Sequence, residues 1–115
     1  SSAASDVYKR QSCDYPIYGK AVAEAIAAGK QDLGILICGT GIGMSMVANK
    51  VEGVRAALCS DCFSAQATRE HNNANVLCMG ARTIGPGLAL MIVDKFVDTP
   101  FSNDERHVRR IKMFS

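Results

Sequence analysis

Three short apolar runs, each followed by a stretch with helical spacing, constrain the fold of this chain more than any other feature. The runs cover residues 33–38, 54–59 and 76–80, and glycine or polar residues end each of them. Such runs are typical of strands, and the first predicts a strand covered on both faces. The helical spacing predicts helices over residues 14–29, about 44–51, 60 or 61 to 71, 85 or 86 to 97, and 103–113.

Strands that alternate with helices pair in parallel through right-handed crossovers. The sequence therefore predicts an α/β fold, a three-layer Rossmann-like sandwich with a parallel sheet. Three strands make a thin sheet, since domains of this class usually carry more. We therefore expect the first strands of the fold to precede the given sequence, and residues 13–115 to form a single domain that is incomplete at its N-terminus.

Residues 1–12 show no periodicity and resemble a translated sequencing adapter. We interpret them as a non-native or disordered leader. Without the leading strands, the 33–38 strand should have an open, apolar edge, and the chain should be poorly soluble or inactive in isolation.

Length and charge exclude several classes of protein. The 115 residues suffice for one domain, so a two-domain enzyme is ruled out. A composition of 48% hydrophobic and 21% charged residues, with a net charge of +2, is that of a folded globular chain. The basic residues 106–112 lack interleaved aromatic side chains, so no nucleic-acid partner is expected. Without a long apolar span or a signal peptide, the chain should have no membrane partner and a cytoplasmic location.

The most informative motif is the glycine loop at residues 38–43, Cys-Gly-Thr-Gly-Ile-Gly, where a predicted strand ends and a helix begins. Glycines let backbone N–H groups turn toward an anion, and the helix start adds positive potential. This field should favour the thiolate of Cys38 and let it act as a nucleophile or base. Two alternatives remain: a tight turn with a buried cysteine, and a dinucleotide site with Asp61 holding a ribose, although the third glycine stands one position too early.

The other candidate residues have ordinary structural explanations. An odd count of five cysteines favours reduced thiols over a disulfide framework, and Cys59 with Cys62 lacks a second half for a zinc site. His71 and the asparagines after it suit a helix end. Arg82 follows the third strand, at the edge of Cys38, whereas Arg106 and Arg110 share one helix face that could clamp a phosphate or simply be solvated.

A set of motifs in shared order and spacing resembles ribose-5-phosphate isomerase type B, a family that includes galactose-6-phosphate isomerase subunits. The resemblance covers nearly everything from Asp14 to Met113, through Asp-Tyr-Pro at 14–16, the segment 34–43, Ala-Asn-Lys at 48–50, Arg-Ala at 55–56, Ser-Ala-Gln at 64–66, His-Asn at 71–72, Asn-Val-Leu at 75–77, Gly-Ala-Arg at 80–82 and Arg-His at 106–107.

The resemblance implies an aldose–ketose isomerase of a small sugar phosphate, with ribose 5-phosphate and ribulose 5-phosphate as the first choice and galactose 6-phosphate as an alternative. It implies that Cys38 is the base of an enediolate mechanism and that Thr40 and His71 assist ring opening. Met44 stands where other members place a glutamate, so the chain looks like the cysteine-base type. The substrate-binding residues implied are Tyr15, Gly39, Gly41, Ile42, Gly43, Ser45, Asn72, Arg82, Arg106 and Arg110.

The resemblance implies neither a metal nor an organic cofactor. It also implies a leading strand that ends in an Asp-His pair, which this sequence lacks. Because His71 ends a helix that runs back along the sheet, it should lie at the opposite edge from Cys38. We therefore expect a homodimer or higher homo-oligomer with active sites shared between chains. A non-catalytic sugar-phosphate-binding module and a nucleotide-binding module remain as alternatives.

Overall fold

A computed structural model describes residues 13–115 of the chain, and the leader predicted at 1–12 lies outside the described residues. Helices and strands alternate as expected. They are α2 (Tyr15–Ala27), β1 (Gly34–Cys38), α3 (Ile42–Ala48), β2 (Ala56–Leu58), α4 (Cys62–Asn72), β3 (Val76–Gly80), α5 (Pro86–Asp98) and α6 (Glu105–Lys112).

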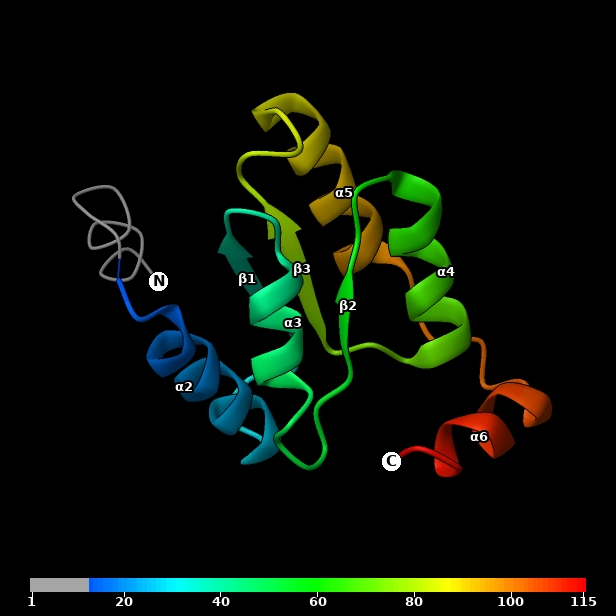
Figure 1. Ribbon diagram of the computed structural model, residues 1–115. Coiled ribbons are helices and arrows are strands. Elements are labelled where there is room, and N and C mark those ends of the chain that lie inside the picture. The colour runs from blue at the N-terminus through cyan, green and yellow to red at the C-terminus, as the bar shows by residue number, and fades with distance from the viewer. Residues whose placement is uncertain (1–12) are drawn as a thin grey trace.

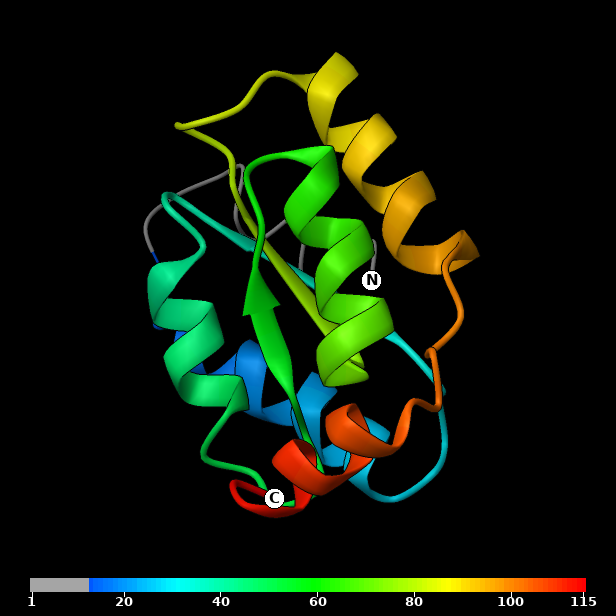
Figure 2. The same cartoon turned by 90° about the vertical axis from the view of Figure 1, so that its right-hand side faces the viewer.

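The three strands form a parallel sheet in the order β1-β3-β2. Figures 1 and 2 show α2 and α3 on one face of this sheet and α4 and α5 on the other, while α6 lies across the end where the strands begin. The predicted three-layer α/β sandwich is confirmed. The register places Cys38 beside Gly80, so the carboxyl ends of β1 and β3 meet at one edge.

Each face of β3 packs in a separate apolar core. One core contains Val76 and Cys78 and unites β1, α2 and α3; the other contains Leu77 and Met79 and unites β3, α4 and α5. All five residues of β3 are buried. The central strand therefore fixes the position of the loops that follow it and β1.

The expectation that residues 33–38 form a strand covered on both faces is wrong for the described residues. Ile35 and Ile37 are 40% and 45% exposed, whereas Leu36 and Cys38 are buried. The reason is the place of β1 at the edge of the sheet, where no described helix covers the face that these two isoleucines occupy. Among residues 13–115, β1 pairs with β3 alone, so its other edge carries no strand there.

The helix after the glycine loop begins and ends earlier than the predicted 44–51. It starts at Ile42 because Gly41 adopts a left-handed conformation, with φ of 82°, and serves as its N-cap. After it ends, the side chain of Asn49 donates to the carbonyl of Ala56 at 3.0 Å and accepts from its N–H at 2.8 Å. This bridge leads the chain into a β2 of three residues, shorter than predicted.

Within residues 13–115, no helix is both long and apolar enough to cross a membrane. The cytoplasmic location expected from the sequence stays a prediction.

Candidate active site

Cys38 is the last residue of β1, and its sulfur faces the glycine loop. The backbone N–H of Gly41 donates to the Sγ of Cys38 at 3.1 Å, and the residue is 7% exposed. The arrangement therefore places the sulfur directly beside the glycine loop, with the amide of Gly41 pointing at it.

The loop is held against the end of β3 by two backbone hydrogen bonds. Ala81 donates to the carbonyl of Cys38 at 2.8 Å, and Arg82 donates to that of Gly39 at 3.0 Å. The approach is close enough that a Cβ on Gly80 would lie 2.7 Å from the backbone of Thr40. A glycine is therefore required at position 80 for the loop to sit where it does.

The first turn of α3 carries further residues that the family resemblance implied. Thr40 accepts from the N–H of Ile42 at 3.2 Å, and Ser45 donates to the Ile42 carbonyl at 2.6 Å. The hydroxyl of Tyr15, at the start of α2, lies where a Cβ on Gly43 would be. Because Gly43 has no side chain, the Tyr15 ring can pack directly against the loop.

Arg82 is exposed at this same edge, as its position after β3 predicts. Its Cδ lies 3.8 Å from where a Cβ on Gly39 would be, so the side chain passes beside the loop. Together, Tyr15, Cys38, residues 39–43, Ser45 and Arg82 form one cluster, which we call the loop cluster.

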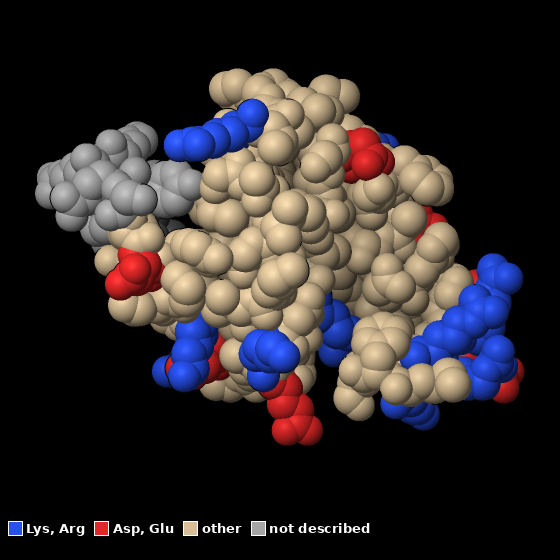
Figure 3. Space-filling view, in the orientation of Figure 1, with Lys and Arg blue, Asp and Glu red and all other residues tan. Residues whose placement is uncertain are grey.

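The remaining predicted residues lie elsewhere. His71 and Asn72 are the last two residues of α4, and Arg106 and Arg110 belong to α6, which packs against the end of α4. We call these four the helix cluster. Asn72 lies on the wall of a cavity of about 580 Å³ that is also lined by Lys50, Arg55, Thr68 and Phe114. Figure 3 shows Lys and Arg side chains gathered over α6.

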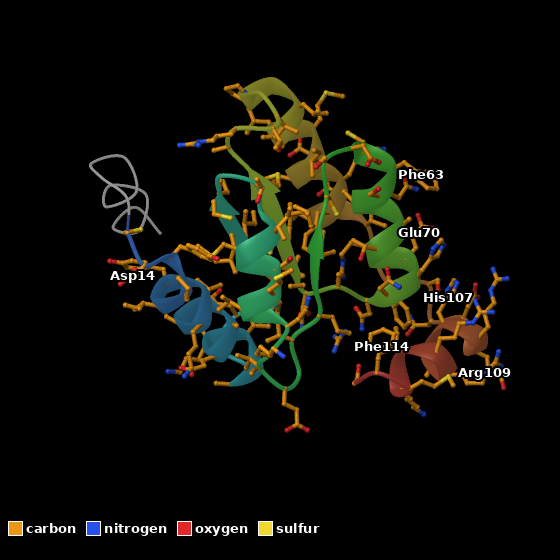
Figure 4. All side chains as sticks on the ribbon, viewed as in Figure 1. Asp14, Phe63, Glu70, His107, Arg109 and Phe114 are labelled. Atoms are coloured by element: carbon orange, nitrogen blue, oxygen red, sulfur yellow. The ribbon has the colours of Figure 1, made fainter. Side chains whose placement is uncertain are left out.

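The two clusters lie at opposite edges of the sheet. The α4 helix starts just after β2 and ends just before β3, so it runs antiparallel to the strands. Figure 4 marks this direction, with Phe63 near the start of α4 and Glu70 close to its end beside His107. Eleven helical residues span about 16 Å. Within one chain, the structure therefore does not bring Cys38 and His71 to one small substrate.

A family model described as Ribose/Galactose Isomerase matches residues 3–114. The chain belongs to this family. It is 57% identical to YwlF of Bacillus subtilis over 104 residues, which cover 90% of this chain and 69% of that protein. It is 50% identical to ribose-5-phosphate isomerase B of Escherichia coli over 99 residues, or 86% of this chain and 66% of that protein.

A solved structure of a family member has the same fold. The type B ribose 5-phosphate isomerase of Trypanosoma brucei superposes with a TM-score of 0.89 at 49% identity, over 90% of this chain and 70% of that chain. The resemblance to this family noted in the sequence is confirmed. The given sequence spans about two thirds of the length of these relatives.

The chain also buries two further cysteines, Cys59 and Cys78. Burial raises the pKa of Cys78 to about 12, with smaller contributions from Cys38 and Cys59. Burial, followed by the charge of Asp61, raises the pKa of Cys59 to about 11. Thiols of this kind stay protonated and unreactive near neutral pH. All five cysteines are free, as the odd count predicts.

Asp61 does not lie free to hold a ribose, as the dinucleotide alternative needs. It caps α4, and accepts from the N–H of Ser64 at 2.7 Å and from its hydroxyl at 2.8 Å. These bonds hold the pKa of Asp61 below its usual range. Among residues 13–115, no three His, Cys, Asp or Glu side chains gather in a way that could hold a metal ion.

Sequence reasoning missed the contact partners of His71. The ring of His107 lies 4.6 Å from the ring of His71, centroid to centroid, and Ser102 bonds to His107. His107 stands inside the basic run 106–112, which the sequence alone presents as a solvated face. Its place beside Val108 and one turn before Ile111, the two apolar residues of α6, was the available signal.

Proposed function

We propose that this protein is an aldose–ketose isomerase that interconverts ribose 5-phosphate and ribulose 5-phosphate. The observation that carries the proposal is the sulfur of Cys38, placed at a strand end with a glycine-loop N–H donated to it at 3.1 Å. It gains weight from membership of the Ribose/Galactose Isomerase family.

The proposed reaction moves protons within one sugar phosphate. In the open-chain aldose, the Cys38 thiolate removes the proton from C2, and the electron pair moves toward the C1 carbonyl oxygen to give an enediolate. The proton then returns to C1 while the proton of the C2 hydroxyl passes to the C1 oxygen, so that C1 becomes an alcohol and C2 becomes the ketone. Because the oxidation at C2 balances the reduction at C1, no external oxidant or reductant is consumed.

Backbone amides of residues 39–43 stabilise the developing oxyanion in this proposal, since preorganised donors suit charge that builds during a reaction. The Gly41 N–H, which donates to Cys38 in this structure, would stabilise the thiolate before it removes the proton from C2. Thr40 and His71 exchange protons with the sugar during ring opening.

The other residues hold the substrate. Arg106 and Arg110 bind the phosphate, because guanidinium groups present paired donors to phosphate oxygens. Asn72 binds sugar hydroxyls. Tyr15, Ser45 and Arg82 contact the substrate at the loop cluster in this proposal. Its support is that Tyr15 lies against Gly43, Ser45 donates to the Ile42 carbonyl and Arg82 passes beside Gly39.

Because the loop cluster and the helix cluster lie apart within one chain, the proposal includes an active site shared between two chains. If Cys38 and His71 serve one substrate, the helix cluster of one chain must meet the loop cluster of another. A two-fold dimer would then contain two equivalent sites. Its subunits would be two copies of this chain.

The face around β2 fits such a second copy. Four large apolar side chains are exposed there on α3, β2 and α4, namely Ile42 at 45%, Met46 at 64%, Leu58 at 39% and Phe63 at 78%. Figure 3 shows this face as mainly uncharged, with Lys, Arg, Asp and Glu toward its rim. It also lies between the two clusters, so pairing through it would bring each cluster toward its counterpart.

The direct test is an isomerisation assay with ribose 5-phosphate, with galactose 6-phosphate measured in parallel. The assay uses this chain and a version extended by the leading strand with its Asp-His pair that the family resemblance implies. We expect ribulose 5-phosphate to form faster than the product of galactose 6-phosphate. Turnover of galactose 6-phosphate alone would change the assigned substrate to galactose 6-phosphate. Binding of both sugar phosphates without turnover would indicate a non-catalytic binding module.

A further inference from the structure

His107 is the one residue of α6 that is buried, with 7% of its surface exposed. Its neighbours Arg106, Arg109 and Arg110 are exposed. A histidine is costly to bury without partners, because its ring nitrogens must be satisfied. The contacts of this ring therefore indicate what its burial achieves.

The first contact is the ring of His71 at the end of α4. The two ring centroids are 4.6 Å apart, and the ring planes are inclined by 38°. His71 itself is exposed. One side of its imidazole thus rests on His107, and the rest is open to a substrate.

The second contact holds the His107 ring in place. Its Nδ1 lies 2.8 Å from the hydroxyl oxygen of Ser102. Ser102 makes two further hydrogen bonds. Its N–H donates to the carbonyl of Glu70 at 3.2 Å, and its hydroxyl oxygen accepts from the N–H of Asp104 at 3.2 Å. The Glu70 carbonyl directly precedes His71, so the linkage runs from α4 to His107 and back to the ring of His71.

The charges around His107 favour its neutral form. Burial lowers the pKa of His107, and His71 of α4 together with Arg106 and Arg110 of α6 lower it further, while Asp104 acts in the opposite direction. Near neutral pH, His107 is therefore an uncharged support beside His71.

We propose that His107, held by Ser102, is a positioning residue that fixes the orientation of the His71 imidazole for its proton transfer to the sugar ring. The inference rests on the proposed function for the role of His71 in ring opening. The close approach of the two rings and the hydrogen bond between Ser102 and His107 support the positioning role of His107.

The first test needs no turnover. The chain contains two histidines, so the imidazole Cε1–H region of an NMR spectrum holds two signals, which His71→Asn assigns. In Ser102→Ala we expect the His71 signal to move, although the Ser102 hydroxyl bonds to His107 and to the N–H of Asp104, not to His71. Ser102→Thr, which keeps the hydroxyl, should restore the parental signal, and Arg109→Gln on the exposed side of α6 should leave it unchanged.

The second test separates kcat from KM for ribose 5-phosphate. A misplaced proton donor slows a chemical step, whereas phosphate binding stays intact, so kcat of Ser102→Ala should fall roughly 3- to 10-fold with KM within about twofold of the parent. Ser102→Thr should recover most of the loss.

Several results would overturn the inference. An unmoved His71 signal in Ser102→Ala would show that His107 does not hold this ring, and a moved signal with unchanged kcat would show that its orientation does not matter to turnover. A parent protein without isomerase activity would refute the proposed function instead, and the NMR signals would then decide alone whether His107 orients His71.

Discussion

At the scale of single residues, Cys38 is distinguished by its surroundings. Its sulfur accepts an N–H from Gly41, although Cys38 lies in the same apolar core as Cys78. Burial raises the pKa values of Cys59 and Cys78 to about 11 and about 12. The same residue type therefore serves packing in β3 and just after β2 and, in our proposal, chemistry at the end of β1.

Replacing Cys38 by serine should abolish most isomerisation and leave sugar-phosphate binding nearly intact, because serine is similar in size but a far poorer base near neutral pH. Initial rates and binding of ribose 5-phosphate measure the two effects. Cys62→Ser is the matched control and should keep parental turnover. A Cys38→Ser rate above about a tenth of the parental rate would argue against a base role.

At the scale of helices and strands, caps and glycines decide where elements begin. Asp61 stabilises the start of α4 through Ser64, and its pKa is lowered by that bonding. A lowered carboxyl pKa means that the stabilisation is complete above the unfolded-state value of about 4 and is lost as the pH falls through the folded-state value.

We therefore expect Asp61→Ala to lower the melting temperature by about 3–6 °C at pH 7. The difference from the parent should shrink as the pH falls below the usual aspartate range. Asp61→Asn, which also caps a helix, is the control. Thermal unfolding of the three proteins at several pH values measures this, and a difference that persists undiminished in acid would contradict the ionised cap.

The α6 helix presents Arg106 and Arg110 one turn apart, both exposed. Either arginine replaced by alanine should weaken ribose 5-phosphate and inorganic phosphate together, by about 1–3 kcal/mol. Calorimetric titration measures both ligands, and Arg109→Ala serves as the control on the same helix. Equal affinity of parent and variants would remove the pair from the phosphate site.

The sequence predicted elements well where apolar runs end in glycine or polar residues, as in β1, β3 and α2. It predicted β2 too long, because the Asn49 bridge to Ala56 that precedes this strand is a tertiary contact. It also failed for Ile35 and Ile37, since an apolar residue indicates burial but not which segment covers it. The burial of His107 was not predicted, because this residue stands within a basic run. The placement of Cys38 and His71 at opposite edges of the sheet followed from topology alone.

At the scale of the whole molecule, the edge of β1 is the part of the described chain most prone to self-association. An unpaired strand edge beside apolar side chains favours self-association. Ile35→Thr with Ile37→Lys should therefore reduce aggregation of the 115-residue chain, as measured by light scattering over time. Parent chains that stay monodisperse under the same conditions would show that this edge is protected.

The central claim is that one active site takes Cys38 from one chain and His71 from another. Mixing inactive Cys38→Ser chains with inactive His71→Ala chains tests it most directly, because subunit exchange would give mixed dimers with one intact site each. We predict recovery of about a quarter of parental activity, since about half the dimers would be mixed and one of their two sites would work. No recovery, with subunit exchange demonstrated by differently tagged chains, would contradict the shared site and place His71 either in the site of its own chain or outside catalysis.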